Sequence, residues 1–577
     1  MTKFLKYISA SFTTHLYFWI FVIVFFCAIC DAFFTYSEFG RLFYIDTDCY
    51  THATRIIYWL QNFGWYEQIY PYSNYPDGEV FHFTRLLDII WTLSALPLMP
   101  FFSLKDAIFY GGMTISPLAM ALSLITIFWG LKPFISNSTK VLFFSCCVSI
   151  CLLTKFYNIF DFNRPDHHSV IFLFFAYNIS AVLLNLFQKR FRLLFFAGIL
   201  AGCGIWISSA VEGFILIGSV LSLLVCNWIL GKISLKALQF YSLGLFSATA
   251  FAFLINPPYG GYMVLDNTRL CSIHVVLTLF ILISFRLLSK FNLKSKSAQI
   301  FSLTGCALTS LLLLCAIFGS NIIFAPIFTE EAKRYFLSYI TELKPSYTFP
   351  YIIEMAFFLI AIIFLTCYRK FDNNQLIARN LAYLSLYYFI PSVFAVRFVP
   401  YELCILAYLN IIFINHLFAF NISLKYNKIL AIGYIYVIIF ILCSFTITIF
   451  PPINSAVIPQ NSNILTDIYS APQLIFDKQI KVIGIPYHPA SFGITENYKI
   501  FNSADEVVIK KLLQRHNIEY IYLPSKSFYR INEANLSETD SNKFYMKLNI
   551  GKNLYPWLTK IDTNTKDLLY KIDYQKF

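Results

Sequence analysis

Charged side chains are scarce in this sequence of 577 residues. Asp, Glu, Lys and Arg together make up 13% of the chain, whereas soluble globular domains contain about 25%. Apolar residues make up 58%, and the mean hydropathy is +0.63. This composition excludes a soluble globular protein and predicts an α-helical polytopic membrane protein.

Cysteine is missing from the last part of the chain. All 14 cysteines precede residue 451, most of them within apolar segments, so neither a disulfide framework nor a zinc site is predicted. Acids are also fewer than bases, 31 against 44, which gives a formal net charge of +13. Because the bases lie in short loops between apolar segments, they indicate membrane topology. The predicted partner is therefore the lipid bilayer, not nucleic acid.

Thirteen apolar stretches have the length of about 17 to 25 residues that a bilayer core requires. Lys and Arg gather at the N-terminus and in every second loop between these stretches, which predicts that those loops are cytoplasmic. Asp and Glu lie mostly in the opposite loops, on the outer side of the cell (inner) membrane. The stretches cover residues 14–33, 111–131, 140–157, 169–187, 193–210, 213–230, 235–255, 272–288, 300–324, 350–368, 380–397, 399–420 and 429–450.

One further apolar stretch, residues 86–102, contains Asp88, Pro97 and Pro100 and is not expected to cross the bilayer. A crossing there would scramble the alternation of positive charge. We interpret it as an interfacial or re-entrant segment of a large first outer loop, residues 34–110. The same loop is expected to contain a short amphipathic helix from His52 to Phe63.

The composition becomes polar after Pro451-Pro452, which separates a transmembrane domain, residues 1–450, from a domain of residues 451–577. Residues 480–484 and 519–523 have strand patterns, and Ser503 is expected to cap a helix that runs to about His516. The sequence therefore predicts a small C-terminal α/β soluble domain. Thirteen crossings from a cytoplasmic N-terminus place it on the extracytoplasmic, periplasmic side.

Carboxylates and imidazoles recur at two predicted outer membrane exits. Asp46 and Asp48 follow the first apolar stretch, and Asp166, His167 and His168 precede the fourth. Asp48, Asp166 and His168 suit a divalent cation such as Mg²⁺ or Mn²⁺, which would neutralise phosphate oxygens of a ligand. The alternative interpretation of Asp166, His167 and His168 is an acid at a helix N-terminus beside two histidines at the membrane interface. Asp46 is either a supporting partner of the cation site or a helix cap.

These motifs resemble the catalytic subunit of oligosaccharyltransferase, within the C-type integral-membrane glycosyltransferases, and most closely its single-subunit archaeal and bacterial form. The similarity rests on Asp48-x-Tyr50-x-His52 after the first span, Asp166-x-His168 before the fourth, and Ile340-Thr341-Glu342 in the outer loop after the ninth. It implies that Asp48, Asp166 and His168 hold a metal. It also implies that Glu342 lies beside the acceptor, with Asp48 and Glu342 as the catalytic carboxylates.

The resemblance further implies that Arg397 meets the diphosphate of a polyprenyl-linked sugar donor. A metal and a guanidinium together neutralise the charge that develops on the leaving phosphate. The alternative interpretations are a snorkelling arginine at 397 and a loop acid at 342 paired with Lys344. Residues expected to line the same cavity, or to support the site, are Asp46, His52, His82, Arg85 and His167.

The C-terminal domain departs from the protein-directed members, because it contains Trp557 but no Trp-Trp-Asp triplet. In those relatives the triplet recognises the hydroxyl of an Asn-x-Ser/Thr acceptor. The expected function is therefore transfer of a sugar or oligosaccharide from a polyprenyl phosphate or diphosphate to an extracytoplasmic lipid or glycan, with protein N-glycosylation as the alternative. A lipid or glycan transporter is a third class, but transporters normally place polar residues at mid-membrane and show internal repeats.

Overall fold

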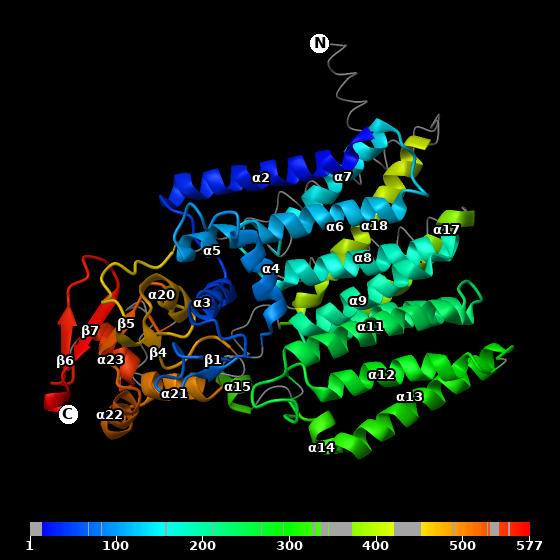
Figure 1. The fold of residues 1–577 in the computed structure, drawn as a ribbon. Helices are drawn as coiled ribbons and strands as arrows, with labels where there is room; N and C mark the ends of the chain where they lie inside the picture. The colour runs from blue at the N-terminus through cyan, green and yellow to red at the C-terminus, as the bar shows by residue number, and fades with distance from the viewer. Residues whose placement is uncertain are drawn as a thin grey trace, which may run out of the picture.

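The computed structural model describes residues 14–577 apart from residues 67, 82, 156–158, 210–211, 267, 292, 327–329, 336–343, 346–371, 420–451, 488–490, 528, 531–541 and 552–553. A bundle of long helices forms one part of the molecule, and a domain built around a β-sheet forms the other (Figure 1). The bundle contains α2 (Leu16–Phe39), α6 (Ile115–Leu131), α7 (Thr139–Lys155), α8 (His167–Gln188), α9 (Phe191–Ile207), α10 (Glu212–Ile229), α11 (Leu235–Ile255), α12 (Ser272–Leu288), α13 (Lys296–Phe318), α17 (Asp372–Phe394) and α18 (Val399–Ala419).

Seven helical segments in the described part of the chain are long and apolar enough to cross a membrane, which supports a multi-pass membrane protein. They are Leu16–Phe39, Leu104–Leu131, His167–Gln188, Glu212–Ile229, Leu235–Ile255, Lys296–Phe318 and Val396–Asn415. Three shorter apolar helices occur at Val141–Ile150, Phe191–Ile207 and Ser272–Leu288. The predicted count of thirteen crossings is thus not confirmed. Two of the expected crossings, residues 350–368 and 429–450, lie outside the described residues.

Apolar side chains cover the outside of the bundle, which explains the composition. Phe18, Phe26 and Phe33 of α2 are 62%, 65% and 68% exposed. In water such surface would be unfavourable, but a bilayer core is itself apolar and solvates it. α18, in contrast, is buried at the centre of the bundle along most of its length.

Glycines allow α9 and α11 to pack with their backbones in close contact. A β-carbon at Gly198 would lie 2.0 Å from the carbonyl oxygen of Tyr241, and one at Gly244 would lie 2.0 Å from that of Phe195. Small residues at helix interfaces permit this approach in membranes, where packing replaces the hydrophobic effect as the driving force.

The first outer loop is folded into short elements packed against one another. It contains α3 (Thr47–Asn62), strands β1 (Ile69–Tyr70) and β2 (Glu79–Val80), α4 (Arg85–Ala95) and α5 (Leu104–Gly112). Helix α3 begins five residues before the predicted amphipathic helix, and its residues 49–57 are buried rather than interfacial. Helix α4 has 11 residues and is too short to span a bilayer. This length is consistent with the prediction that residues 86–102 do not cross the membrane.

The C-terminal domain has a five-stranded mixed sheet in the order β4-β3-β5-β7-β6. Its strands are β3 (Asn463–Leu465), β4 (Lys481–Val482), β5 (Tyr520–Leu523), β6 (Leu558–Ile561) and β7 (Leu568–Ile572), and its helices are α20 (Ala471–Lys478), α21 (Ser491–Asn502), α22 (Glu506–Arg515) and α23 (Phe544–Ile550). The predicted α/β character is confirmed. The predicted cap was wrong by two residues, because Asp505, not Ser503, accepts from Val507 N at the start of α22.

The first outer loop and the C-terminal domain share a core. Residues of the loop run along β4, where Val482 N donates to Tyr72 O at 2.8 Å and Asn74 N donates to Ile483 O at 3.1 Å. Tyr70 and Phe81 of the loop belong to the same buried cluster as Ile464, Ile485 and other residues of the domain. This packing holds the domain beside α3, which carries Asp48 (Figure 1).

Candidate active site

Two helices begin at the predicted acidic motifs, and each is capped by its aspartate. Asp46 is the N-cap of α3 and accepts from Asp48 N at 3.0 Å. Asp166 is the N-cap of α8 and accepts from His167 N at 2.6 Å. Such caps satisfy backbone N–H groups that have no partner within the helix, and the carboxylates also match the positive end of the helix dipole. Asp48 lies in the first turn of α3 and is half-buried.

Arg164 joins the two caps. Its Nη2 lies 2.9 Å from Asp46 Oδ2 and 3.7 Å from Asp166 Oδ2. The backbones meet as well, since Ile45 N donates to Asn163 O at 3.1 Å. Of the two alternatives for Asp46, the helix cap is confirmed, and Asp46 is also the ion-pair partner of Arg164.

A third helix N-terminus completes the cluster through Glu212, the first residue of α10. Glu212 Oε1 lies 2.9 Å from His168 Nδ1 and 3.3 Å from Arg397 Nη2, and Glu212 Oε2 lies 3.5 Å from His167 Nε2. The imidazole of His168 reaches Asp166 with its other nitrogen, at 3.6 Å. Asp166, Glu212 and both histidines are at least nine-tenths buried within the protein.

His52 of α3 faces the same cluster. Two groups of described residues bring their ligand atoms within 4.8 Å of one another, namely His52–Asp166–His167 and His167–His168–Glu212. Of the three predicted metal ligands, Asp166 and His168 each belong to one of these groups and lie 3.6 Å apart. Asp48 belongs to neither group.

The charge and chemistry of the cluster fit a divalent cation. Three carboxylates, those of Asp46, Asp166 and Glu212, meet two guanidiniums, those of Arg164 and Arg397, so one negative charge remains among them, and Asp48 adds a further carboxylate in the first turn of α3. Buried charge is costly unless it is compensated, and a divalent cation carries the missing charge. His52 Nε2 is buried without a hydrogen-bond partner among the described atoms. The available ligands mix carboxylate oxygen with imidazole nitrogen, a combination that divalent metals accept.

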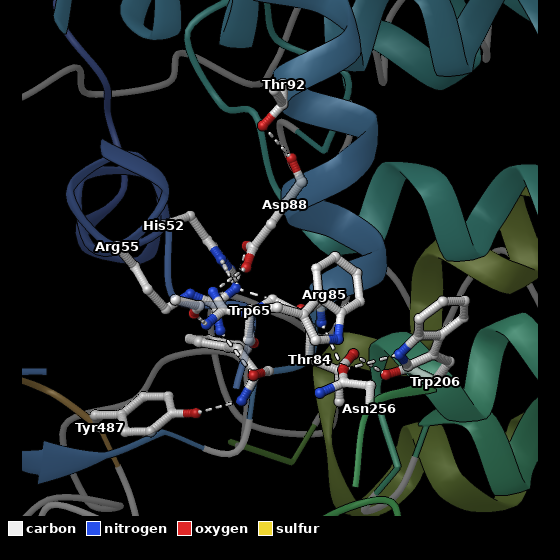
Figure 2. A network of polar contacts seen from close by, with 12 residues as sticks. His52, Arg55, Trp65, Thr84, Arg85, Asp88, Thr92, Trp206, Asn256 and Tyr487 are labelled. Atoms are coloured by element: carbon white, nitrogen blue, oxygen red, sulfur yellow. Dashed lines mark hydrogen bonds and ion pairs between the residues drawn. The ribbon is translucent and has the colours of Figure 1, made fainter. Parts of the chain in front are cut away.

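A second buried network lies directly behind His52 (Figure 2). Asp88 of α4 is fully buried between Arg55 of α3, which forms a close ion pair with its Oδ1, and Arg85, whose Nη1 is 3.2 Å from its Oδ2. Arg55 Nη2 also lies 3.5 Å from His52 Nδ1. Arg85, predicted to line the cavity of the cation site, pairs with Asp88 in this network.

Main-chain carbonyls surround the same two guanidiniums. Arg55 donates to Phe83 O at 2.7 Å, and Arg85 donates to Trp65 O at 3.0 Å. Arg85 N and Trp206 Nε1 both donate to Asn256 Oδ1, at 2.9 and 3.0 Å, as Figure 2 shows. The network therefore ties α3, α4 and the C-terminal ends of α9 and α11 together, and fixes the helix that carries His52.

The surroundings shift the ionisation of two groups outside the spanning helices. Burial by itself raises the pKa of Asp166, but the adjacent His167 and His168, the His167 hydrogen bond and Arg164 outweigh it and hold this pKa well below its usual range. Burial and the charge of Arg55 lower the pKa of His52 well below its usual range. Asp166 is therefore anionic and His52 neutral, which are the forms that bind a cation.

Sequence reasoning missed Glu212 and Arg164. The signal for Glu212 was a lone acid in a two-residue break between apolar stretches, and that for Arg164 was its place two residues before Asp166. Two predicted site residues, His82 and Glu342, lie outside the described residues. The carbonyl of Lys344, the proposed ion-pair partner of Glu342, accepts from Val396 N at 2.9 Å, so Lys344 itself contacts the residue next to Arg397.

A cavity of about 680 Å³ lies between the N-terminal end of α3 and the C-terminal domain. Asp46, Thr47 and Tyr50 line it from α3, and Asp467, Ser470, Lys526 and Lys566 are among the residues that line it from the domain. A molecule the size of a short peptide or glycan segment can therefore reach the acidic cluster from the side of the C-terminal domain.

No protein-family model and no curated protein matches this sequence. Solved structures match it in fold. The archaeal oligosaccharyltransferase AglB from Archaeoglobus fulgidus, in complex with an inhibitory peptide and a dolichol-phosphate, is 12% identical and aligns with a TM-score of 0.70 over 95% of this chain and 80% of that chain. The A. fulgidus oligosaccharyltransferase tethered to an acceptor peptide with an NVT sequon is 13% identical, with a TM-score of 0.64 over 98% of this chain and 75% of that one.

A third structure, of the A. fulgidus oligosaccharyltransferase with Zn and sulfate, is 13% identical and has a TM-score of 0.56 over 82% of this chain and 63% of that chain. The resemblance that the motifs predicted is confirmed at the level of architecture, across the bundle and the C-terminal domain together. This chain has the fold of the archaeal oligosaccharyltransferases.

Proposed function

We propose that this protein is a membrane glycosyltransferase that moves a sugar or oligosaccharide from a polyprenyl-linked donor to an extracytoplasmic acceptor. The observation that carries the proposal is the convergence of three helix N-termini, with Asp46, Asp166 and Glu212, on two histidines and Arg397. Helix N-termini, a cation and a guanidinium all stabilise phosphate. The cluster lies at one end of the helices rather than along a central path, which favours a transferase over a transporter.

The donor side of the site is assigned to Asp48, Asp166, His168 and Arg397. The first three would hold the divalent metal, Mg²⁺ or Mn²⁺, and a bound metal would act as a Lewis acid toward the leaving phosphate. Arg397 binds a phosphate oxygen with its guanidinium, which is 21% exposed. In the reaction, the bond between the sugar C1 and the phosphate oxygen breaks and an acceptor atom bonds to C1. The acceptor loses a proton, for which Asp48 and Glu342 are the proposed carboxylates.

The acceptor that the fold favours is a peptide. Among the structures of this fold, one holds an inhibitory peptide and a dolichol-phosphate and another is tethered to an acceptor peptide. The preference for a lipid or glycan, drawn from the missing Trp-Trp-Asp triplet, is therefore replaced by an Asn-x-Ser/Thr peptide as the first candidate.

A lipid-linked or free glycan is the second candidate, for a specific reason. Trp557 lies in the core of the C-terminal domain with no exposed surface, and its Nε1 donates to Glu506 at 2.8 Å, so it is not available to form the sequon pocket. The cavity beside Asp46 is lined instead by Lys526 and Lys566, which suit an anionic glycan.

The test uses purified protein, a radiolabelled polyprenyl-linked sugar and each acceptor class in turn. We expect label on an Asn-x-Thr peptide and none on the same peptide with Gln in place of Asn. Label on a glycan or lipid acceptor alone would establish the second candidate. Absence of transfer to either, with retained uptake of the lipid into vesicles, would favour the transporter.

Substitutions at the cation ligands test the chemistry. Asp48→Ala and Asp166→Ala should each abolish transfer with normal expression, because removal of one carboxylate leaves the cation undercoordinated. Asp266→Ala is the matched control, since Asp266 is an outer-loop acid paired with Arg269 at 3.2 Å and lies outside the cluster. Transfer that persists in the presence of a chelator would remove the metal from the mechanism.

A further inference from the structure

Glu212 stands out because one carboxylate contacts both halves of the proposed site. It is 1% exposed, and its Oε1 lies within 2.9 Å of His168 Nδ1 and 3.3 Å of Arg397 Nη2. His168 belongs to the metal half and Arg397 to the phosphate half. Nothing in the spacing of the motifs requires an acid here, and Glu212 comes from a helix, α10, that carries none of the other residues.

The contact with His168 has the geometry of a carboxylate that orients a metal ligand. A ligating imidazole uses one ring nitrogen for the metal, and its other nitrogen usually donates to a carboxylate. In His168, Nδ1 lies 2.9 Å from Glu212 Oε1, and Nε2 lies 3.6 Å from Asp166 Oδ2. A carboxylate this close to Nδ1 favours the tautomer with hydrogen on Nδ1, which leaves the Nε2 lone pair on the side of Asp166.

The contact with Arg397 holds the guanidinium at the edge of the same cluster. Arg397 lies in a short 3-10 turn, η3 (Val396–Phe398), between α17 and α18. Its neighbours Val396 and Phe398 are buried and fix the backbone, while the ion pair with Glu212 fixes the side chain. A long flexible side chain loses less entropy on binding phosphate when its position is set beforehand.

We infer that Glu212 is the positioning residue of the site: it orients His168 for the metal and holds Arg397 for the donor phosphate. This inference rests on the proposed function for the identity of the ligands, but its test does not need transfer. A buried acid with a purely structural role needs only one hydrogen-bond donor nearby, and Glu402 is an example in this protein. Glu402 of α18 is fully buried and accepts from Ser385 Oγ at 2.6 Å.

The experiment measures Mn²⁺ binding to the purified full-length protein by electron paramagnetic resonance of the free ion, without donor or acceptor. Glu212→Gln keeps the shape but loses the charge and places an amide beside His168 Nδ1, so Mn²⁺ affinity should fall about 10- to 100-fold. Glu212→Asp retains the charge and should recover part of that loss. Glu402→Gln is the matched control and should bind Mn²⁺ as the wild type does.

A double-mutant cycle separates orientation of His168 from general damage. In a His168→Ala background, Glu212→Gln should cause no further loss of Mn²⁺ affinity, because the ring that Glu212 orients is gone. Unchanged affinity in Glu212→Gln, an equal loss in Glu402→Gln, or additive losses in the cycle would each overturn the inference. If the wild type binds Mn²⁺ and the cycle behaves as expected but no acceptor is glycosylated, the proposed function fails while the role of Glu212 toward the metal stands.

Discussion

The buried network of Arg55, Asp88 and Arg85 gives a direct test of how the first outer loop is held (Figure 2). Asp88→Asn is the perturbation, because asparagine has nearly the same shape as aspartate. The side chain at 88 is fully buried, and those of Arg55 and Arg85 are 8% and 5% exposed, so water cannot replace the lost carboxylate.

The size of the effect follows from the contacts. The asparagine amide presents one oxygen and one NH₂ group, so at least one arginine N–H faces another donor where it now meets a carboxylate oxygen. Carbonyl oxygens of Phe83 and Trp65 still accept from the two guanidiniums, but they carry no charge. Removing one member of a buried ion pair costs about 3–5 kcal/mol. We therefore expect a loss of this size in the apparent free energy of unfolding.

Denaturant titration of the purified protein in mixed micelles measures the loss, with Lys333→Gln as the control. Lys333 and Glu330 form an exposed pair at 2.6 Å, with side chains 44% and 84% exposed, and such a pair contributes about 0–1 kcal/mol. Asp88→Asn/Arg55→Gln should recover part of the loss, since one buried positive charge is removed together with its partner. If Asp88→Asn is no less stable than Lys333→Gln, the network does not hold the loop in the way its contacts imply.

Two further predictions concern the outer loop. Burial raises the pKa of Glu79 to about 7, although the hydrogen bond from Ser73 acts in the opposite direction. The folded state therefore binds the carboxyl proton more tightly than the unfolded state does. The free energy of unfolding should be highest below about pH 4.5 and should fall by roughly 3 kcal/mol as the pH rises to about 7. Glu79→Gln should remove this loss, so its melting temperature should exceed that of the wild type at pH 8 and equal it near pH 4.5; equal values at both pH values would contradict the assignment. Cysteines introduced at exposed Asp77 and exposed Lys526 should both react with an impermeant reagent on intact cells, since the loop and the C-terminal domain share a core; labelling of one alone would separate the two regions.

The sequence could predict the parts of the site that are made by local pattern. Asp46 follows one apolar segment and Asp166 precedes another. A carboxylate at a helix N-terminus accepts hydrogen bonds from backbone N–H groups that have no partner within the helix, and this preference does not depend on the tertiary fold. Strands β4 and β5 and helix α22 were likewise predictable from local pattern, including Pro524, which ends the strand after Leu523, whereas β3, β6 and β7 were not predicted. The start of α3 was missed because its first turns contain the polar residues Thr47, Asp48 and Thr51, of which Thr51 is buried and the other two are half-buried. Burial of polar residues depends on partners from elsewhere in the chain.

Glu212 and Arg164 could not be predicted because their local sequence gives them the appearance of ordinary loop charges. A single acid at residue 212 and a single base at residue 164 resemble the many charges found where apolar segments end. Their pairing with distant residues leaves no trace in the local hydrophobic pattern of the sequence. Their roles arise only when three helix N-termini meet, which brings Glu212 to His168 across 44 positions of sequence and to Arg397 across 185. Arg85 illustrates a pattern with two interpretations. Its spacing from Asp88 is compatible with a cavity lining, but three residues on one helix is also the spacing of an ion pair, which Arg85 and Asp88 form. Arg55 of α3 binds the same carboxylate, a contact between distant residues that local sequence does not indicate.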